Sequence, residues 1–147
     1  MFLENQISLG TGDEFKLPKK LIIFRDVIVD RGSKYTVVGG YVKTDKEVKD
    51  FINYLLKDKY FQKSTHNSYA YRIKLENGSI LEGKNDDGEI GAGMCILREL
   101  QRANAVDIVL VVTRYFGGIK LESDRFKNVI DSCKIFFEKI NLTNHNK

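Results

Sequence analysis

The sequence predicts an α+β fold, a two-layer sandwich in which a mixed or antiparallel sheet carries helices on one face. A long apolar run at 109–113 has the composition of an inner strand. Alternation of apolar and polar residues at 66–75 indicates a second strand, and the Asn77-Gly78 pair indicates a return turn. Apolar residues at helical spacing begin at Val48 and again at Phe126. In this arrangement the second face of the sheet is expected to stay open.

The first part of the chain has the pattern of an arm followed by strands. Residues 1–20 lack sustained periodicity and hold the only proline, so we expect a flexible N-terminal arm. Apolar runs at 21–24 and 27–29 indicate one edge strand or two. A longer run at 35–42 indicates another strand, in which the glycine pair 39–40 marks a bulge or the close approach of another backbone.

A helix is predicted to begin at Thr44. Thr44 and Glu47 form a capping box, in which each side chain bonds a backbone donor that the helix leaves unpaired. The apolar residues that follow share one side of the helix: Val48, Phe51, Ile52, Leu55 and Leu56. Charges on the other side show no bias of sign, so we interpret this helix as scaffold.

The predicted hairpin carries tyrosines on one of its faces. Tyr69 and Tyr71 share the apolar face of the strand at 66–75. The Asn77-Gly78 pair predicts a type I′ turn after this strand. Tyrosines so placed indicate a packed layer, and a platform for stacking nucleic-acid bases is the alternative.

A run of carboxylates precedes the next predicted helix. Asp86, Asp87 and Glu89 stand just before a glycine-rich helix start. The plain interpretation is a cap, because carboxylates stabilise the positive end of a helix. One alternative is an anion cradle at the helix start, which the carboxylates would oppose. The other is a divalent-ion site, although the run lacks the ligand spacing of an EF-hand loop.

The stretch 109–120, VLVVTRYFGGIK, is the centre of the predicted sheet. An inner strand here delivers Arg114, Tyr115 and Lys120 at or beyond its end. On spacing alone, Arg114 is a solvated or salt-bridged residue at the rim of the core. A functional role for these three residues depends on which other groups meet them.

The last predicted helix opens at Ser123, a residue suited to the N-cap, with Asp124 in the first turn. Its apolar stripe includes Cys133, which we therefore interpret as structural. The predicted organisation is a flexible arm at 1–20, one folded domain at 21–140 and a polar tail at 141–147.

Composition bounds the class of protein. A chain of 147 residues suits one domain with a sizeable core. The N-terminus is too polar for a secretory signal and no apolar run approaches a membrane span, so we expect a cytoplasmic protein, with the nucleus as the alternative. Cys95 and Cys133 are expected to be reduced and buried. The sequence shows no zinc motif and calls for no metal or cofactor.

The net charge of +4 and a pI of about 9.0 permit contact with RNA or the ribosome without predicting it. Basic and acidic residues, 24 and 20 in number, are interspersed along the chain. Surfaces that follow a phosphate backbone concentrate Lys and Arg on one face, and no predicted helix has such a stripe.

Three blocks of sequence, taken together, resemble the Impact family, which includes eukaryotic translation regulators and bacterial YigZ-like proteins. The blocks are DRGSKY at 30–35, STHNSYAYRI at 64–73, and the pair DDGEIGAG at 86–93 with VTRYFGGIKL at 112–121. The ending SDRFKNVIDSC is similar to the eukaryotic branch. Glu122 departs from the family pattern, which usually has Gly there, and Lys34 replaces a common Arg or polar residue. The resemblance makes 21–140 an Impact-type domain.

The resemblance implies a fold similar to the second domain of ribosomal protein S5. It also implies a role, because eukaryotic Impact regulators bind the ribosome-associated activator of an amino-acid-starvation kinase and damp that response. Those regulators carry an additional N-terminal RWD domain, for which residues 1–26 leave no room. The expectation is an Impact-type domain without the RWD domain.

Three functional hypotheses follow. The leading one is a non-enzymatic regulatory binding module of translation and amino-acid-starvation signalling, whose partner is the kinase-activator protein or the ribosome. The second is an RNA- or ribosome-binding domain, with its cations on the open sheet face: Lys34, Arg72, Lys74, Arg114 and Lys120. The third is a hydrolase-like enzyme, with a carboxylate or His66 as general base and Arg114 holding an anion. The chain offers this enzyme no recognisable activated Ser or Cys nucleophile.

A single candidate binding surface would serve the leading hypothesis if the separated blocks meet in space. The plain alternative for its histidine is a hydrogen-bonded strand cap. The candidate residues are His66, Asn67, Tyr71, Arg72, Asp86, Asp87, Glu89, Arg114, Tyr115 and Lys120.

Overall fold

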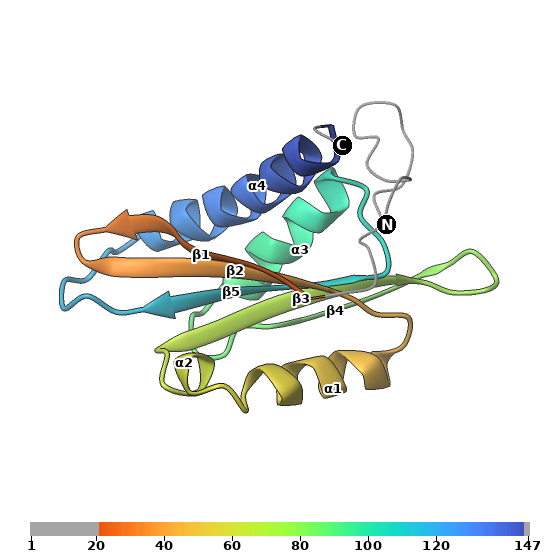
Figure 1. Cartoon of the computed structure of the whole chain (residues 1–147), viewed down its shortest axis with the longest axis horizontal. Coiled ribbons are helices and arrows are strands. Elements are labelled where there is room, and N and C mark those ends of the chain that lie inside the picture. Colours follow the sequence, from red (N-terminus) through yellow and green to blue (C-terminus); the bar gives the residue numbers. More distant parts are fainter. Residues whose placement is uncertain (1–20, 146–147) are drawn as a thin grey trace.

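The structure, a computed structural model, describes residues 21–145. In this part of the chain a five-stranded sheet lies between two layers of helices (Figure 1). The strands are β1 (Ile22–Asp30), β2 (Ser33–Tyr41), β3 (His66–Lys74), β4 (Ile80–Asn85) and β5 (Ile108–Tyr115). The helices are α1 (Asp45–Leu55), α2 (Lys59–Gln62), α3 (Ala92–Arg102) and α4 (Asp124–His145). The predicted α+β class is confirmed.

The sheet is antiparallel at every pairing, in the order β1-β2-β5-β3-β4. β5 is the central strand, as predicted, and its residues from Ile108 to Arg114 are buried. Its neighbours β2 and β3 are both remote in sequence, so the sheet is held mainly by long-range pairs. The central strand therefore sets the positions of the other four.

Helices cover both faces of the sheet, so the prediction of helices on one face only is wrong. α3 and α4 pack with Leu110 and Val112 on one side, and α1 and α2 pack with Val109 and Val111 on the other (Figure 1). The physical reason lies in β5 itself. Successive side chains of a strand point to opposite faces, so an unbroken apolar run requires cover on both.

The first helix forms as its capping box predicts. The Glu47 backbone N–H donates to the Thr44 hydroxyl at 3.0 Å, and the Glu47 carboxylate accepts from the Lys43 backbone N–H at 2.6 Å. The predicted bulge at 39–40 is absent, because these glycines pair regularly with β5. Gly40 instead admits a ring, since a Cβ atom there would lie 2.2 Å from Phe51. The missing side chain thus lets α1 approach the sheet.

The two apolar runs at the start of the domain form one edge strand, β1. Its register with β2 shifts between Phe24 and Ile28, at the polar pair that separates the runs. Asp26 has a φ of +50° there, and its backbone N–H donates to the Thr36 hydroxyl at 3.1 Å. The irregularity therefore lies in β1, which is an edge strand, and β-bulges are common in edge strands.

The β3–β4 hairpin lies where predicted but lacks the predicted type I′ turn. A type I′ turn needs positive φ at both central residues, and of the pair only Gly78 has it, at +90°. Asn77 instead accepts the Ser79 backbone N–H on its side-chain oxygen at 3.0 Å. The connection is accordingly a longer loop, which the Asn77 side chain stabilises from within.

The last element of the described residues is a long helix. α4 continues to His145, into the residues predicted as a polar tail from 141. The predicted arm at 1–20 lies outside the described residues, and the domain boundaries stay predictions. None of the helices in the described part is both long and apolar enough to cross a membrane.

Candidate functional site

Three separated blocks of sequence meet at one end of the sheet, around the carboxylate of Glu89. His66 and Arg114 are paired neighbours on β3 and β5, and both side chains point toward the acidic loop between β4 and α3. Arg114 Nη1 donates to both Glu89 oxygens, at 3.0 and 2.9 Å. His66 Nε2 lies 3.0 Å from Glu89 Oε1. The Glu89 cluster, defined as these three residues together with Arg125, is the centre of the candidate site.

The central ion pair is buried. Glu89 is 4% exposed and Arg114 is 7% exposed, so water screens their charges only weakly. Burial without a partner would cost each group several kcal/mol, and the pairing removes most of that cost. The sequence analysis interpreted Arg114 as a residue at the rim of the core, either solvated or salt-bridged. The structure shows that Arg114 is salt-bridged and buried.

Both ring nitrogens of His66 face oxygen atoms. Its Nδ1 lies 2.8 Å from the backbone oxygen of Asp87, an acceptor, while Nε2 faces the Glu89 carboxylate at 3.0 Å. A neutral imidazole has one donor nitrogen only, so both contacts are hydrogen bonds when the ring carries two protons. His66 therefore joins the cluster through both of its ring nitrogens. The contact of His66 with the Asp87 backbone oxygen corresponds to the hydrogen-bonded strand cap that the sequence predicted.

Asp86 caps α3, as the plain interpretation of the acidic run predicted. Its two oxygens accept the backbone N–H groups of Gly91 and Gly93, at 3.1 and 2.8 Å. Gly91 has a φ of +94°, a conformation that favours glycine. Because Asp86 holds these amides, they are not available to a phosphate, and the anion-cradle alternative is wrong.

Asp87 and Asn67 fasten the acidic loop to β3. The Asn67 backbone N–H donates to Asp87 Oδ2 at 2.7 Å. The Asn67 side chain accepts the Thr113 hydroxyl at 2.7 Å and donates to the Phe61 backbone oxygen at 2.9 Å. Asn67 therefore ties β3 to β5, to the acidic loop and to α2. Within residues 21–145 no group of His, Cys, Asp and Glu is placed to hold a metal ion.

Arg125, which the sequence analysis did not single out, completes the cluster. Its Nε lies 3.5 Å from Glu89 Oε2, and its Nη1 donates to the Glu122 backbone oxygen at 3.0 Å. The signal that could have found it is the SDRF sequence, which places Arg125 in the first turn of a helix beginning at Asp124.

Two of the candidate surface residues lie elsewhere. Tyr71 packs over Gly83, where a Cβ atom would lie 2.4 Å from its ring. Arg72 pairs with Glu82 at 2.9 Å and donates to the Ala105 backbone oxygen at 3.0 Å. Both stand near the far end of β3, about 20 Å from its first residue at the usual rise per residue. The structure therefore does not bring these two residues together with His66.

The remaining two candidates, Tyr115 and Lys120, lie in different surroundings. Tyr115 points to the opposite sheet face, where its hydroxyl donates to the Tyr60 backbone oxygen and the two rings lie 5.0 Å apart. Lys120 is exposed and lines a cavity beside the cluster together with His66 and Arg114. Lys120 therefore lies beside the Glu89 cluster, whereas Tyr115 lies on the other face of the sheet.

The five cations of the nucleic-acid hypothesis do not share a face. Lys34 lies on the same side of β2 as Thr36, whose hydroxyl is 2.7 Å from the Tyr60 hydroxyl of α2. Arg72 and Arg114 point to the side of α3 and α4, where each is bound to a carboxylate. Lys74 ends β3 at the end away from the cluster. The open face on which these cations were placed is covered by α1 and α2.

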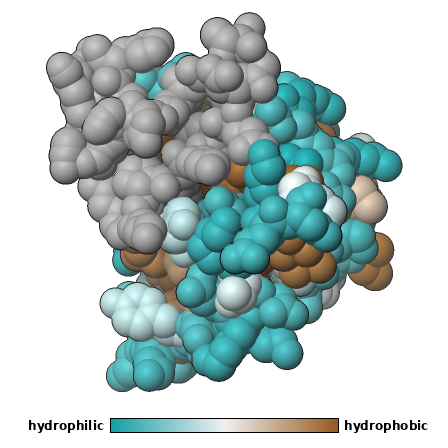
Figure 2. All heavy atoms as spheres, turned by 90° about the vertical axis from the view of Figure 1, so that its right-hand side faces the viewer, coloured by the Kyte–Doolittle hydropathy of each residue, from teal (hydrophilic) through white to brown (hydrophobic). Residues whose placement is uncertain are grey.

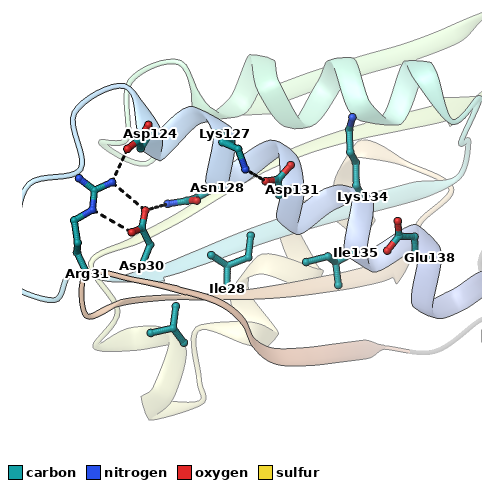
Figure 3. A pocket seen from close by; sticks show the side chains of 11 residues that line it. Ile28, Asp30, Arg31, Asp124, Lys127, Asn128, Asp131, Lys134, Ile135 and Glu138 are labelled. Atoms are coloured by element: carbon teal, nitrogen blue, oxygen red, sulfur yellow. Dashed lines mark hydrogen bonds and ion pairs between the residues drawn. The ribbon is translucent and has the colours of Figure 1, made fainter.

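A second hollow, missed by the sequence analysis, lies between β1 and α4. It measures about 610 Å³, and Arg31 spans its end, bonding Asp30 at 3.0 Å and Asp124 at 2.5 Å (Figure 3). Asn128 also donates to Asp30, at 2.9 Å. Hydrogen bonds from Arg31 and Asn128 hold the pKa of the Asp30 carboxyl below its usual range. This network joins the β1–β2 turn to α4.

With the geometry in place, comparison with known proteins decides the family. The profile of the Impact N-terminal domain matches residues 31–135. The chain belongs to the Impact family. The resemblance predicted from the three blocks is thereby confirmed, and the Glu89 cluster is a feature of an Impact-type domain.

The similarity extends to named relatives and to a solved structure. The chain is 40% identical over 119 residues to the Protein IMPACT homolog of Dictyostelium discoideum, covering 81% of this chain and 34% of that one. It is 36% identical over 118 residues to human Protein IMPACT, covering 80% and 37%. The structure of the two-domain translational regulator Yih1 matches with a TM-score of 0.55 and 25% identity, over 90% of this chain and 52% of that one. The chain thus spans little more than a third of the length of these two named relatives.

Proposed function

We propose that this Impact-family chain is a cytoplasmic, non-enzymatic binding module of translation regulation. Its proposed partner is the ribosome-associated activator of an amino-acid-starvation kinase, and its proposed effect is to damp activation of that kinase. The support is membership of the Impact family over 31–135 and the structural likeness to a protein described as a translational regulator.

The observation that carries binding over catalysis is how the Glu89 cluster is bonded. Both Asp86 oxygens accept backbone N–H groups, Asp87 accepts another, and Glu89 lies against Arg114 and His66. A general base needs a lone pair that faces the substrate. Here the carboxylates fasten a loop to a sheet, which favours a rigid recognition surface over a hydrolase site.

Apolar side chains beside the cluster suit a protein partner. Ile90 is 74% exposed, Phe116 47% and Ile119 55%, and each is close in sequence to a residue that bonds within the site. At the opposite end of the molecule, the part that Figure 2 shows in colour is mostly hydrophilic, with apolar patches between polar ones. Exposed aromatic and aliphatic residues around a polar centre are the usual anchors of protein interfaces.

A pull-down tests the proposal. The full chain, immobilised, is exposed to extracts of amino-acid-starved cells, with ribosomes present or removed. We expect the kinase-activator protein to be retained in both extracts. A mainly apolar interface should hold as salt rises, whereas binding through RNA phosphates weakens steeply. Absence of every translation component from the retained fraction would refute the proposed role.

Matched variants locate the interface. Phe116→Ala combined with Ile119→Ala should lower retention about tenfold or more, because buried aromatic anchors carry much of the binding free energy. Val29→Ala is the control, since Val29 is also an exposed apolar residue, at 61%, but borders the β1–α4 hollow. Equal loss in both variants would place the interface elsewhere.

A further inference from the structure

A cavity of about 270 Å³ opens beside the Glu89 cluster, at the ends of β3 and β5 and the start of α4. It has room for several water molecules, each of which occupies about 30 Å³ in the liquid. Its lining combines basic groups with apolar ones: Thr65, His66, Arg114, Phe116, Lys120, Leu121, Glu122 and Arg125. Such a lining is unlike the two apolar cores and is suited to a charged ligand.

The wall of the cavity carries more positive than negative charge. The guanidinium groups of Arg114 and Arg125 and the imidazole of His66 converge on the single carboxylate of Glu89, so the two guanidinium charges exceed the carboxylate charge by one. Lys120 and Glu122 at the cavity mouth cancel one another. Because Glu89 and Arg114 are buried, water screens this excess less than it would at the surface, so an anion would be stabilised there.

Arg114 retains hydrogen-bonding capacity in the present arrangement. Only its Nη1 donates to Glu89, and its Nε donor is buried without an acceptor. Buried donors are rarely left unpaired in proteins, and those that are left often mark a binding function. Thr65 at the wall accepts the Phe116 backbone N–H on its hydroxyl at 2.9 Å, so its own proton stays available to a ligand.

We propose that this cavity binds the phosphoryl group of a phosphorylated serine or threonine in a partner protein. A phosphoryl group carries close to two negative charges at neutral pH and three acceptor oxygens. Guanidinium groups recognise such oxygens in charge-assisted hydrogen bonds, and clusters of Arg are the common means of phosphopeptide recognition. A carboxylate has only two acceptor oxygens and would leave more of these donors unpaired.

The surroundings favour a peptide over RNA as the carrier of the phosphoryl group. A nucleic-acid backbone presents successive phosphates and requires a row of cations to follow it. Lys34 faces the other side of the sheet, and Arg72 stands near the far end of β3 in an ion pair. Exposed Phe116 and Ile119 beside the cavity offer apolar contacts to residues that flank a phosphorylated side chain.

Phosphoryl binding would deepen the proposed function. It rests on that function in one respect only, which is that the molecule bearing the phosphoryl group is taken to be a protein. Binding is measured by calorimetry on the full chain with four probes. They are inorganic phosphate, a phosphoserine peptide library with apolar flanks, the same library unphosphorylated, and a random single-stranded RNA. We expect the phosphorylated library to bind at least tenfold tighter than the unphosphorylated one, and inorganic phosphate to compete with it.

Variants tie the binding to the cavity. Lys120→Ala should weaken phosphopeptide binding about threefold to tenfold, as expected for one charged contact at a partly exposed site. Arg125→Gln should weaken it further and retain the shape of the side chain. Lys134→Ala is the matched control, because Lys134 lines the β1–α4 hollow and not this cavity. Circular dichroism of each variant shows whether the fold is kept.

The results of these measurements decide between the possible ligands of the cavity. Equal affinity for both libraries, or equal loss in the Lys134 control, would overturn the cavity as a phosphoryl site. RNA binding that depends on Lys120 and Arg125, without phosphopeptide binding, would overturn the peptide assignment. Retention of the kinase activator with no phosphoryl binding would leave the proposed function standing and remove this inference alone.

Discussion

Glu89 and Arg114 form a buried ion pair across the acidic loop and the central strand, with both carboxylate oxygens within 3.0 Å of one guanidinium nitrogen. The pair joins residues 25 positions apart and so closes the loop between β4 and α3 onto β5. Because β5 is the innermost strand, the acidic loop is held to the most rigid part of the sheet.

Removing one member of this pair should be costly. Glu89→Ala leaves Arg114 charged and buried, and we expect a loss of about 3–5 kcal/mol in the free energy of unfolding, measured with urea. Replacing both residues should cost less than the sum of the two single changes. Lys46→Ala, which breaks an exposed pair with Asp50 at 3.0 Å, is the control and should change stability by less than about 1 kcal/mol.

Two adjacent glycines should respond to alanine for different reasons. A Cβ atom on Gly117 would lie 2.1 Å from the Gly32 backbone carbon, so Gly117→Ala must move the β1–β2 turn. Gly118 faces open space but has a φ of +97°, so Gly118→Ala meets only conformational strain, worth about 1–2 kcal/mol. We expect the Gly117 variant to have the lower melting temperature. The reverse order would contradict the close approach of the two loops.

The two cysteines should differ in reactivity. Cys133 is fully buried, and burial raises the pKa of its thiol well above the usual value. Cys95 is partly exposed, and burial raises its thiol pKa as well. Because the thiolate is the reactive form, a thiol reagent at pH 8 should modify Cys95 slowly and Cys133 only after unfolding. Rapid modification of Cys133 in the folded protein would show that the core between α3 and α4 opens readily.

Stability should fall at acid pH through Asp30. Hydrogen bonds from Arg31 and Asn128 lower the pKa of Asp30 in the folded protein below its ordinary value of 3.8. A carboxyl with a lowered folded-state pKa stabilises the fold above its unfolded-state pKa and loses that contribution as pH falls through the folded-state value. The free energy of unfolding, measured from pH 5 to pH 2, should therefore fall less in Asp30→Asn than in the native chain. A parallel decline in both proteins would remove Asp30 from the acid response.

The elements with strong local patterns could be predicted from the sequence. The central strand, the capping box at Thr44 and the cap role of the acidic run all depend on neighbours within a few residues, and the structure confirms each. The layering was predicted wrongly although its signal was present. A strand as uniformly apolar as 108–112 has two faces to cover, and this outweighs the expectation of an open face.

The parts that could not be predicted depend on long-range pairing. Arg125 reaches Glu89 only because α4 begins beside the end of β5, which local spacing cannot show. The contact of Asn128 with Asp30 joins residues 98 positions apart. Conversely, Tyr71 and Arg72 share a motif with His66 but stand near the other end of the same strand. Proximity in sequence along an extended strand does not mean proximity in space.

The double role of β5 has a consequence for how the domain unfolds. Alternate residues of this one strand belong to two separate cores, so detaching either pair of helices exposes apolar groups of the strand that the other pair needs in place. The two helical layers should therefore melt together in one cooperative transition, and a partly unfolded form that keeps only one layer should not accumulate.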